Sequence, residues 1–264
     1  MIDYCYHTHT YRCGHARGTE EEYVLSAIEK GYKVIGFTDH VFLPFIIQEG
    51  MRGNYEELDD YINTINHLKE KYKDKIEIHL GFECEYGEDY VEYYRYLKQE
   101  KGVEYLILGQ HLFFENNDLV WLSCAGTPEE MLEKYSKAVV DAINTGLFTY
   151  IAHPDLFIRF FSEINPFVER HIRMMCEAAK NNHIPFEINL GALRDGGRRQ
   201  KPNQLTYPDE GFFKIVKEYD IPVIIGIDAH DPRDFDPVIS KIEYAQQFAK
   251  DLGLKLLNRI DFKE

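Results

Sequence analysis

Short apolar runs rich in Ile, Val, Tyr and Phe alternate along the chain with longer segments whose apolar residues recur at helical spacing. The runs predict strands at about 2–7, 33–38, 76–84, 104–110, 149–153, 184–189 and 222–228. The segments between them predict helices at about 19–30, 54–72, 88–101, 166–181, 209–219 and 239–252, and one more that begins near Thr127. Repeated alternation of strand and helix is typical of a parallel sheet with helical crossovers.

No Pro-, Gly- or Ser-rich linker separates these units along the 264 residues. We therefore expect residues 1–264 to form a single α/β domain, a closed or nearly closed β/α barrel rather than two open sheets. In such a barrel the carboxyl ends of the strands converge on one face, and catalytic residues lie there.

The overall charge narrows the choice of partners. The chain has 45 acidic and 30 basic residues, a formal net charge of −15, which repels phosphate backbones and weighs against nucleic acid. A small anionic substrate in a local basic pocket is still compatible with this charge. The five cysteines form neither a disulfide framework nor a CxxC zinc pattern. Because the sequence also has no signal peptide or membrane-length apolar run, we expect a cytoplasmic protein. The sequence does not determine its oligomeric state.

Histidines and acids gather where the predicted strands end. Seven of the 11 histidines and two acids fall at these positions: His7, His9, His15, His40, Glu83, His111, His153, Asp228 and His230. Residues i and i+2 of an extended chain point the same way, so His7 and His9 can serve one site. Imidazole with carboxylate suits Zn²⁺, Mn²⁺ or Fe²⁺. So many ligands exceed the four of a tetrahedral site and fit two or three ions.

Other polar residues receive more ordinary interpretations. His79 lies toward the opposite end of its strand and reads as a hydrogen-bonded core histidine, whereas His67, His171 and His183 read as helix or turn residues. Asp39 and Glu85 stand beside predicted ligands, so each could orient a ligand or contact a metal itself.

The pattern as a whole resembles the PHP (polymerase and histidinol phosphatase) domain family. The resemblance rests on His7-Thr-His9, Cys13-Gly-His15, Asp39-His40, Gly81-Phe-Glu83, Gly109-Gln-His111, Ala152-His153-Pro154 and Asp228-Ala-His230. Within the family the chain is most similar to the histidinol-phosphate phosphatases, through the loop around His15 and the segment from Glu187 to Arg194. Two departures concern the substrate: Gly109-Gln-His111 replaces a common Ser-Val-His, and the stretch 196–202 is longer and more basic.

The resemblance implies a distorted seven-stranded barrel that holds three divalent ions. His7, His9, Glu83 and Asp228 would bind the first ion. Glu83 would bridge to the second, completed by His111 and His153, and His15, His40 and His230 would bind the third. The implied activity is hydrolysis of L-histidinol phosphate to L-histidinol and phosphate, a step of histidine biosynthesis.

Phosphoester chemistry suggests further roles. A hydroxide that bridges two ions would attack phosphorus, because metal ions lower the pKa of bound water; Glu83 and Asp228 would thus act in catalysis as ligands of these ions. Guanidinium groups match phosphate oxygens, so Arg159 and Arg194, and less strongly Arg198, are expected to bind the substrate. Asn189 is expected to orient the substrate, and Asp39 or another nearby acid to protonate the leaving group.

Three alternatives stay open on the sequence. A PHP phosphatase or phosphodiesterase could act on another small phosphoester, such as a nucleotide. Metal-dependent amide hydrolysis on a related barrel often uses a carboxylated lysine, but His111 occupies the relevant strand end. A PHP module without catalytic activity would be expected to lose ligands, whereas all nine positions are filled here.

Overall fold

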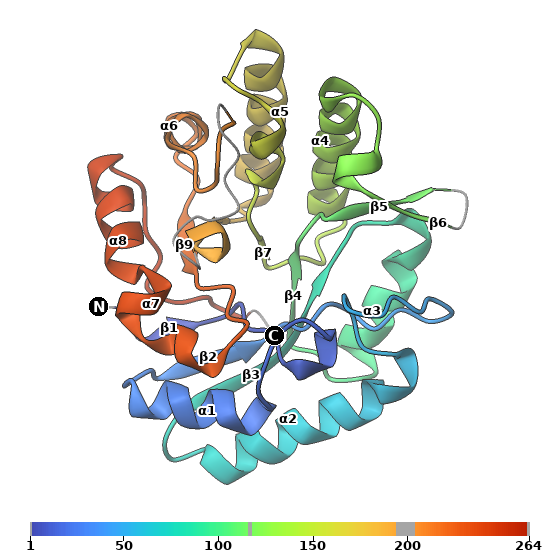
Figure 1. The fold of residues 1–264 in the computed structure, drawn as a ribbon, viewed down its shortest axis with the longest axis vertical. Helices are drawn as coiled ribbons and strands as arrows, with labels where there is room; N and C mark the ends of the chain where they lie inside the picture. The colour runs from blue at the N-terminus through green and yellow to red at the C-terminus, as the bar shows by residue number, and fades with distance from the viewer. Residues whose placement is uncertain (1, 116–117, 194–203, 263–264) are drawn as a thin grey trace.

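Seven parallel strands curve around a common interior, with the main helices on the outside (Figure 1). A computed structural model describes residues 2–115, 118–193 and 204–262. The strands of the sheet, in spatial order, are β1 (Tyr4–Cys5), β2 (Val34–Phe37), β3 (Glu77–Cys84), β4 (Tyr105–Leu108), β7 (Tyr150–Ile151), β8 (Phe186–Asn189) and β9 (Val223–Gly226). Every neighbouring pair is parallel, as the predicted βα alternation requires.

The first and last strands are joined just beyond their carboxyl ends. Thr8 pairs with Ala229 in a parallel bridge, in which Ala229 N–H donates to His7 O at 3.0 Å and His9 N–H donates to Ala229 O at 2.8 Å. Farther from the carboxyl ends, the segment 255–257 bonds to both β9 and β1. Leu257 N–H donates to Val223 O at 2.8 Å, and the Tyr4 hydroxyl donates to Leu257 O at 3.0 Å. The predicted nearly closed β/α barrel is confirmed, and the junction lies between two of its ligand-bearing strand ends.

The helices cover the outside of the sheet. They are α1 (Glu20–Glu29), α2 (Leu58–Tyr72), α3 (Val91–Gln99), α4 (Pro128–Asn144), α5 (Pro166–Asn182), α6 (Glu210–Glu218), α7 (Pro237–Ser240) and α8 (Ile242–Asp251). Their starts follow from local chemistry: Thr127 accepts from the Glu130 N–H while Glu130 bonds back to the Thr127 N–H, a capping box ahead of α4.

Two features differ from the sequence expectation. The helix expected at 239–252 is divided into α7 and α8 at Lys241, whose φ of 62° interrupts the helical backbone. An antiparallel hairpin of β5 (Leu112–Glu115) and β6 (Asp118–Trp121) follows β4 and was not predicted. Its strands are short and the second is half-exposed, so the sequence has no long apolar run that would predict the hairpin.

Tyrosines fill the interior of the barrel below the carboxyl ends. Tyr4, Tyr6, Tyr105 and Tyr150 are buried together there, and the Tyr105 hydroxyl donates to Tyr6 O at 2.8 Å. A larger apolar core lies between the sheet and the helices. With both faces of the strands packed, the strand ends form a firm support for the side chains above them.

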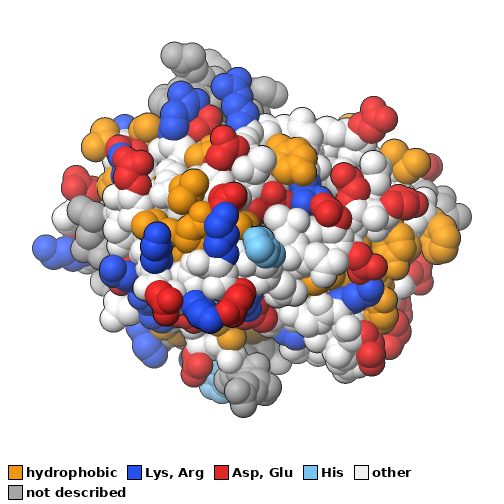
Figure 2. All heavy atoms as spheres, turned by 90° about the horizontal axis from the view of Figure 1, so that it is seen from below, with side chains coloured by type: hydrophobic (Ala, Val, Ile, Leu, Met, Phe, Trp, Pro, Cys, Tyr) orange, Lys and Arg blue, Asp and Glu red, His pale blue; other side chains and the backbone are white. Residues whose placement is uncertain are grey.

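Seen from the side of α1 and α2, the surface carries acidic and basic side chains that are interspersed rather than gathered by sign (Figure 2). Ion pairs such as Lys71 with Glu21 and Lys101 with Asp59 account for part of this pattern. Among the described residues, no helix combines the length and the apolar character that crossing a bilayer requires.

Candidate metal centre

All nine side chains predicted as metal ligands lie together at the carboxyl ends of the strands. They come from six strands and the loop ahead of α1: His7 and His9 (after β1), His15 (loop), His40 (after β2), Glu83 (β3), His111 (after β4), His153 (after β7), Asp228 and His230 (after β9). Close contacts between their ring nitrogens and carboxylate oxygens connect all nine into one cluster.

Glu83 occupies the centre of this cluster and is almost fully buried. Its Oε1 lies 2.8 Å from His153 Nε2, and its Oε2 lies 3.1 Å from His40 Nδ1. The other distances from its oxygens to ring nitrogens are 3.3 Å for His9, 3.5 Å for His7 and 3.6 Å for His111. Burial acts to raise the pKa of Glu83, but the surrounding histidines, His111 foremost, hold that pKa well below its usual value. A carboxylate in this position can serve two ions at once.

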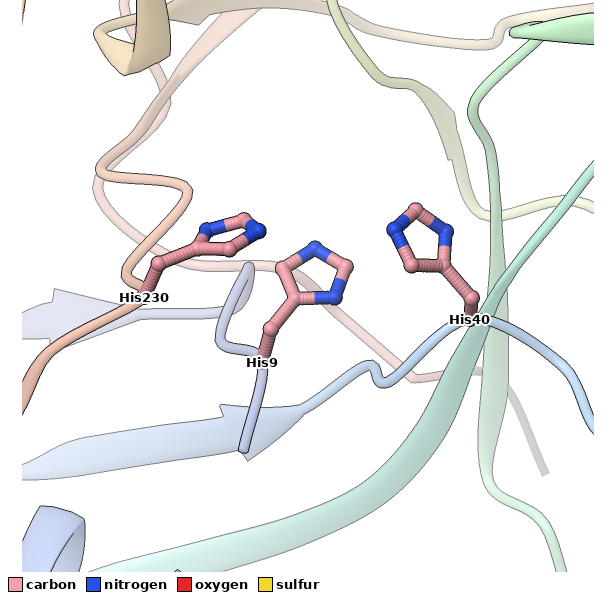
Figure 3. Close-up of side chains that lie close together, drawn as sticks. All are labelled: His9, His40 and His230. Atoms are coloured by element: carbon pink, nitrogen blue, oxygen red, sulfur yellow. The ribbon is translucent and has the colours of Figure 1, made fainter. Parts of the chain in front are cut away.

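A second group of contacts lies on the side of β9 and extends toward solvent. Asp228 Oδ1 is 3.5 Å from His9 Nε2 and 3.3 Å from His230 Nδ1. His230 Nε2 in turn lies 3.0 Å from Nε2 of the exposed His15. Figure 3 shows the rings of His9, His40 and His230 rising from three different elements into a shared space.

The donor set fits divalent transition-metal ions. Ligands of one tetrahedral zinc ion lie roughly 3.3–3.5 Å from one another, because each is about 2.0–2.1 Å from the ion. Nε2 of His7 and Nε2 of His9 are 3.1 Å apart, and both lie 3.5–3.6 Å from Asp228 Oδ1. Mixed nitrogen and oxygen donors favour Zn²⁺, Mn²⁺ or Fe²⁺ over Ca²⁺ or Mg²⁺.

Two of these residues hold an unusual backbone conformation. His153 has φ 30° and Asp228 has φ 54°, in a region that side chains other than glycine rarely adopt. Such strain persists only where the surroundings enforce it, and it concentrates at functional sites. Here it turns both side chains toward the cluster as their strands end.

Glu187 supports the cluster from the end of β8, although sequence reasoning assigned it no role. Its Oε1 accepts from His7 Nδ1 at 2.9 Å, and its Oε2 accepts from the His153 N–H at 2.9 Å. Burial acts to lower the pKa of His7, but carboxylates, Glu187 first, raise it well above its usual value. Gly226 leaves room for Glu187, since a Cβ there would lie 1.7 Å from its Oε1. One feature of the sequence could have identified Glu187: it is an acid near the end of strand 184–189, the one predicted strand without a predicted metal ligand.

A second buried chain of contacts supports His111. Glu85 Oε1 accepts from His111 Nδ1 at 3.2 Å, and Glu85 Oε2 accepts from Arg52 at 3.1 Å. Burial acts to raise the pKa of Glu85, while the Arg52 guanidinium and His111 lower it. Of the two roles open for Glu85, the geometry favours orientation of a ligand. Arg52, which also donates to Val41 O, was not singled out in the sequence.

Asp39 and Asn189 are buried, and their polar atoms are engaged by the protein. Asp39 accepts from both the N–H and the hydroxyl of Thr10 at 2.8 Å, and burial raises its pKa to about 7. Asn189 donates to Glu187 Oε2 at 2.7 Å and accepts from the Gly191 N–H at 2.7 Å. Both side chains therefore hold other parts of the site in place.

A cavity of about 690 Å³ opens above the cluster. Arg159, which the sequence predicts to bind the substrate, is exposed on the short helix that follows His153 and borders this cavity. Arg17 and Arg233 border it too, and sequence reasoning named neither. The predicted substrate residues Arg194 and Arg198 lie outside the described residues.

Comparison with known proteins identifies the family of this β/α barrel. The model of the PHP domain matches residues 6–190, well over half of the chain, and the chain belongs to the PHP domain family.

Several relatives carry phosphatase names. A probable histidinol-phosphatase of Deinococcus radiodurans is 26% identical and aligns over 86% of this chain and 85% of its own length. The histidinol-phosphatase of Bacillus subtilis is 25% identical over 86% of this chain and 93% of its own length. The fold matches a histidinol phosphate phosphatase structure from Lactococcus lactis, complexed with zinc, L-histidinol and phosphate, with a TM-score of 0.75 at 20% identity. That match covers 98% of this chain and 99% of the other.

Proposed function

We propose that this chain is a metal-dependent phosphomonoesterase that hydrolyses L-histidinol phosphate to L-histidinol and phosphate, a step of histidine biosynthesis. The observation that carries the proposal is the cluster of nine ligands around Glu83, placed at the floor of a cavity that arginines also border. The names of the relatives from Deinococcus radiodurans and Bacillus subtilis support the choice of substrate.

Three divalent ions, Zn²⁺, Mn²⁺ or Fe²⁺, would occupy the cluster. His7, His9, Glu83 and Asp228 would hold the first ion, Glu83, His111 and His153 the second, and His15, His40 and His230 the third. Bound divalent ions neutralise phosphoryl charge and supply an ionised water as nucleophile at neutral pH. Glu83, fully surrounded by ring nitrogens, is the carboxylate suited to bridge two of them.

The arginine side chains complete the binding of phosphate. Arg159 borders the cavity from the helix that begins three residues after His153, and its guanidinium would bind a phosphoryl group held at the cluster. Arg194 and Arg198 remain predicted substrate residues.

The buried polar residues position other groups. In this proposal Asp39 positions Thr10 and Asn189 positions Glu187, and neither contacts the substrate. The proton for the leaving group would then come from another acid near the cavity, the alternative to Asp39 that the sequence left open.

The test is release of inorganic phosphate from L-histidinol phosphate by protein reconstituted with Mn²⁺ or Zn²⁺, with a mononucleotide and p-nitrophenyl phosphate alongside. We expect kcat/KM to be highest for L-histidinol phosphate. Equal or higher values for the mononucleotide would reject the substrate and favour another small phosphoester. Absence of metal-dependent hydrolysis of all three would reject the function itself.

Arg159→Ala separates phosphate binding from general effects of a lost charge. Loss of a charge-assisted contact to phosphate should lower kcat/KM about tenfold or more. Arg170→Ala is the matched control, because Arg170 is also exposed and also lies over a phenylalanine ring, but it does not border the cavity. A change of less than twofold in Arg159→Ala would exclude the assigned role.

A further inference from the structure

Part of the cavity lining is apolar, and neither the ligand cluster nor the arginines account for it. Trp121, Leu122 and Leu156 border the cavity there, and we refer to these three side chains as the apolar wall. The Leu122 N–H donates to His111 O at 3.2 Å, and the Leu156 N–H donates to His153 O at 2.9 Å. Backbone hydrogen bonds thus fix the wall to two members of the ligand cluster.

Trp121 is the most exposed part of this wall. It ends β6 and pairs across the hairpin with Leu112, the residue that directly follows His111. Its exposed fraction is 41%, against 4% for Leu122 and 5% for Leu156. Trp121 is also the one tryptophan of the chain. A large ring left in solvent at the edge of a binding cavity is placed to contact a ligand rather than the core.

Other residues that border the cavity have a different chemistry. They include Arg17, Asp231 and Arg233, from the segments that follow β1 and β9. Asp231 already accepts from two nitrogens of Arg233, at 2.9 and 2.7 Å. These charges are therefore partly matched within the protein, whereas the indole of Trp121 offers an exposed apolar face.

We propose that Trp121 stacks on a planar ring in the alcohol portion of the substrate and so determines a preference for ring-bearing phosphomonoesters. The assignment rests on the proposed phosphoester hydrolysis, which fixes the phosphoryl group at the cluster and leaves the alcohol portion beside the apolar wall. An imidazole or imidazolium ring suits an indole face, through stacking and through attraction of the cation to the ring.

Steady-state kinetics of Trp121→Ala test the preference. L-Histidinol phosphate and phenyl phosphate carry a ring, whereas ethanolamine phosphate does not. We expect kcat/KM to fall about tenfold for the two ring esters, mainly through KM, because loss of ring stacking on an aromatic side chain typically has this size. For ethanolamine phosphate kcat/KM should stay within twofold, which also shows that the variant folds and binds metal. Trp121→Phe should keep most of the preference.

Ile239→Ala provides the matched control. Ile239 on α7 has a similar exposed fraction, 46%, and borders the same cavity away from the wall. Its loss should not change the ratio of ring to ringless substrates. Equal losses for all three esters in Trp121→Ala, or the same ring-specific loss in Ile239→Ala, would overturn the assignment.

Tryptophan fluorescence gives a second readout that needs no turnover. Because Trp121 is the one tryptophan, titration of the wild type with L-histidinol in the presence of phosphate should change its emission saturably, and ethanolamine should not. In protein that hydrolyses L-histidinol phosphate, no change at saturating L-histidinol would refute the assignment. If phenyl phosphate shows the ring-specific loss while L-histidinol phosphate is not hydrolysed, the proposed substrate fails and the role of Trp121 stands.

Discussion

Glu187→Gln replaces one buried carboxylate oxygen by an NH₂ group. We expect it to move the proton of neutral His7 from Nδ1 to Nε2. Oε2 of Glu187 accepts from two donors, the His153 N–H and Asn189 Nδ2. The amide oxygen of a glutamine must remain there, because an NH₂ group in its place would face both donors. The NH₂ group then points at His7 Nδ1, which lies 2.9 Å from Oε1 in the wild type, and forces that nitrogen to act as acceptor.

The consequence reaches the proposed ligand atom. With Nδ1 unprotonated, neutral His7 carries its proton on Nε2, the nitrogen 3.1 Å from His9 Nε2 and 3.5 Å from Glu83 Oε1. A protonated nitrogen cannot bind a metal ion. Loss of such a supporting carboxylate typically weakens metal binding about 10- to 100-fold, or about 1.4–2.8 kcal/mol. We expect Glu187→Gln to fall in this range.

The assay is competition for Zn²⁺ between the protein and a chelator of known affinity. Glu104→Gln is the matched control, because Glu104 also accepts from a histidine, His79 Nδ1 at 2.7 Å, but near the opposite ends of the strands. Both substitutions should lower the free energy of unfolding, whereas only Glu187→Gln should weaken Zn²⁺ binding. Zn²⁺ affinity equal to the wild type in Glu187→Gln would refute the reasoning about His7.

Three further outcomes are expected. Gly226→Ala should lower the free energy of unfolding by about 1–3 kcal/mol in urea denaturation, because its Cβ would overlap Glu187; an unchanged midpoint would contradict this packing. Chelation should lower Tm by roughly 5–10 °C, reversed by Zn²⁺ or Mn²⁺, since ions bound by the folded state alone stabilise it; an unaffected Tm would count against bound ions. Burial acts to raise the pKa of Glu104, but hydrogen bonds from His79, Lys69 and the Leu80 N–H outweigh it and lower the pKa to about 2. A depressed pKa stabilises the fold above the unfolded value of 4.5 and loses this effect as pH falls toward 2. The stability gap between wild type and Glu104→Gln should thus be about 1–2 kcal/mol at pH 7, after allowance for partial exposure, and shrink below pH 4.5; a gap independent of pH would reject this.

The sequence predicted which nine side chains would lie together at the strand ends, because their residue types are distinctive. His7, His40, His111 and His153 each follow a different predicted strand, so they indicate one site as soon as the strands are known to be parallel. The barrel itself follows from the same alternation of short apolar runs and helical segments. The start of α4 near Thr127 was also predicted, because the residues that cap a helix are local in sequence.

The supporting residues could not be predicted in the same way. Glu187 and Arg52 act through contacts with residues 180 and 33 positions away in the chain, and neither stands out by type. The exposure of Trp121 depends on a hairpin whose short strands carry no strong apolar signal. Residues that act through tertiary contacts become visible only when the strand ends are brought together.

The number of metal ions per chain tests the central claim most directly. Protein purified without chelator, analysed by elemental mass spectrometry and by native mass spectrometry, should hold about three divalent transition-metal ions per chain. Substitution of Glu83, which lies within 3.6 Å of five ring nitrogens, should remove at least two of them. Fewer than two ions per chain in the wild type, under conditions where the protein is folded, would contradict the account.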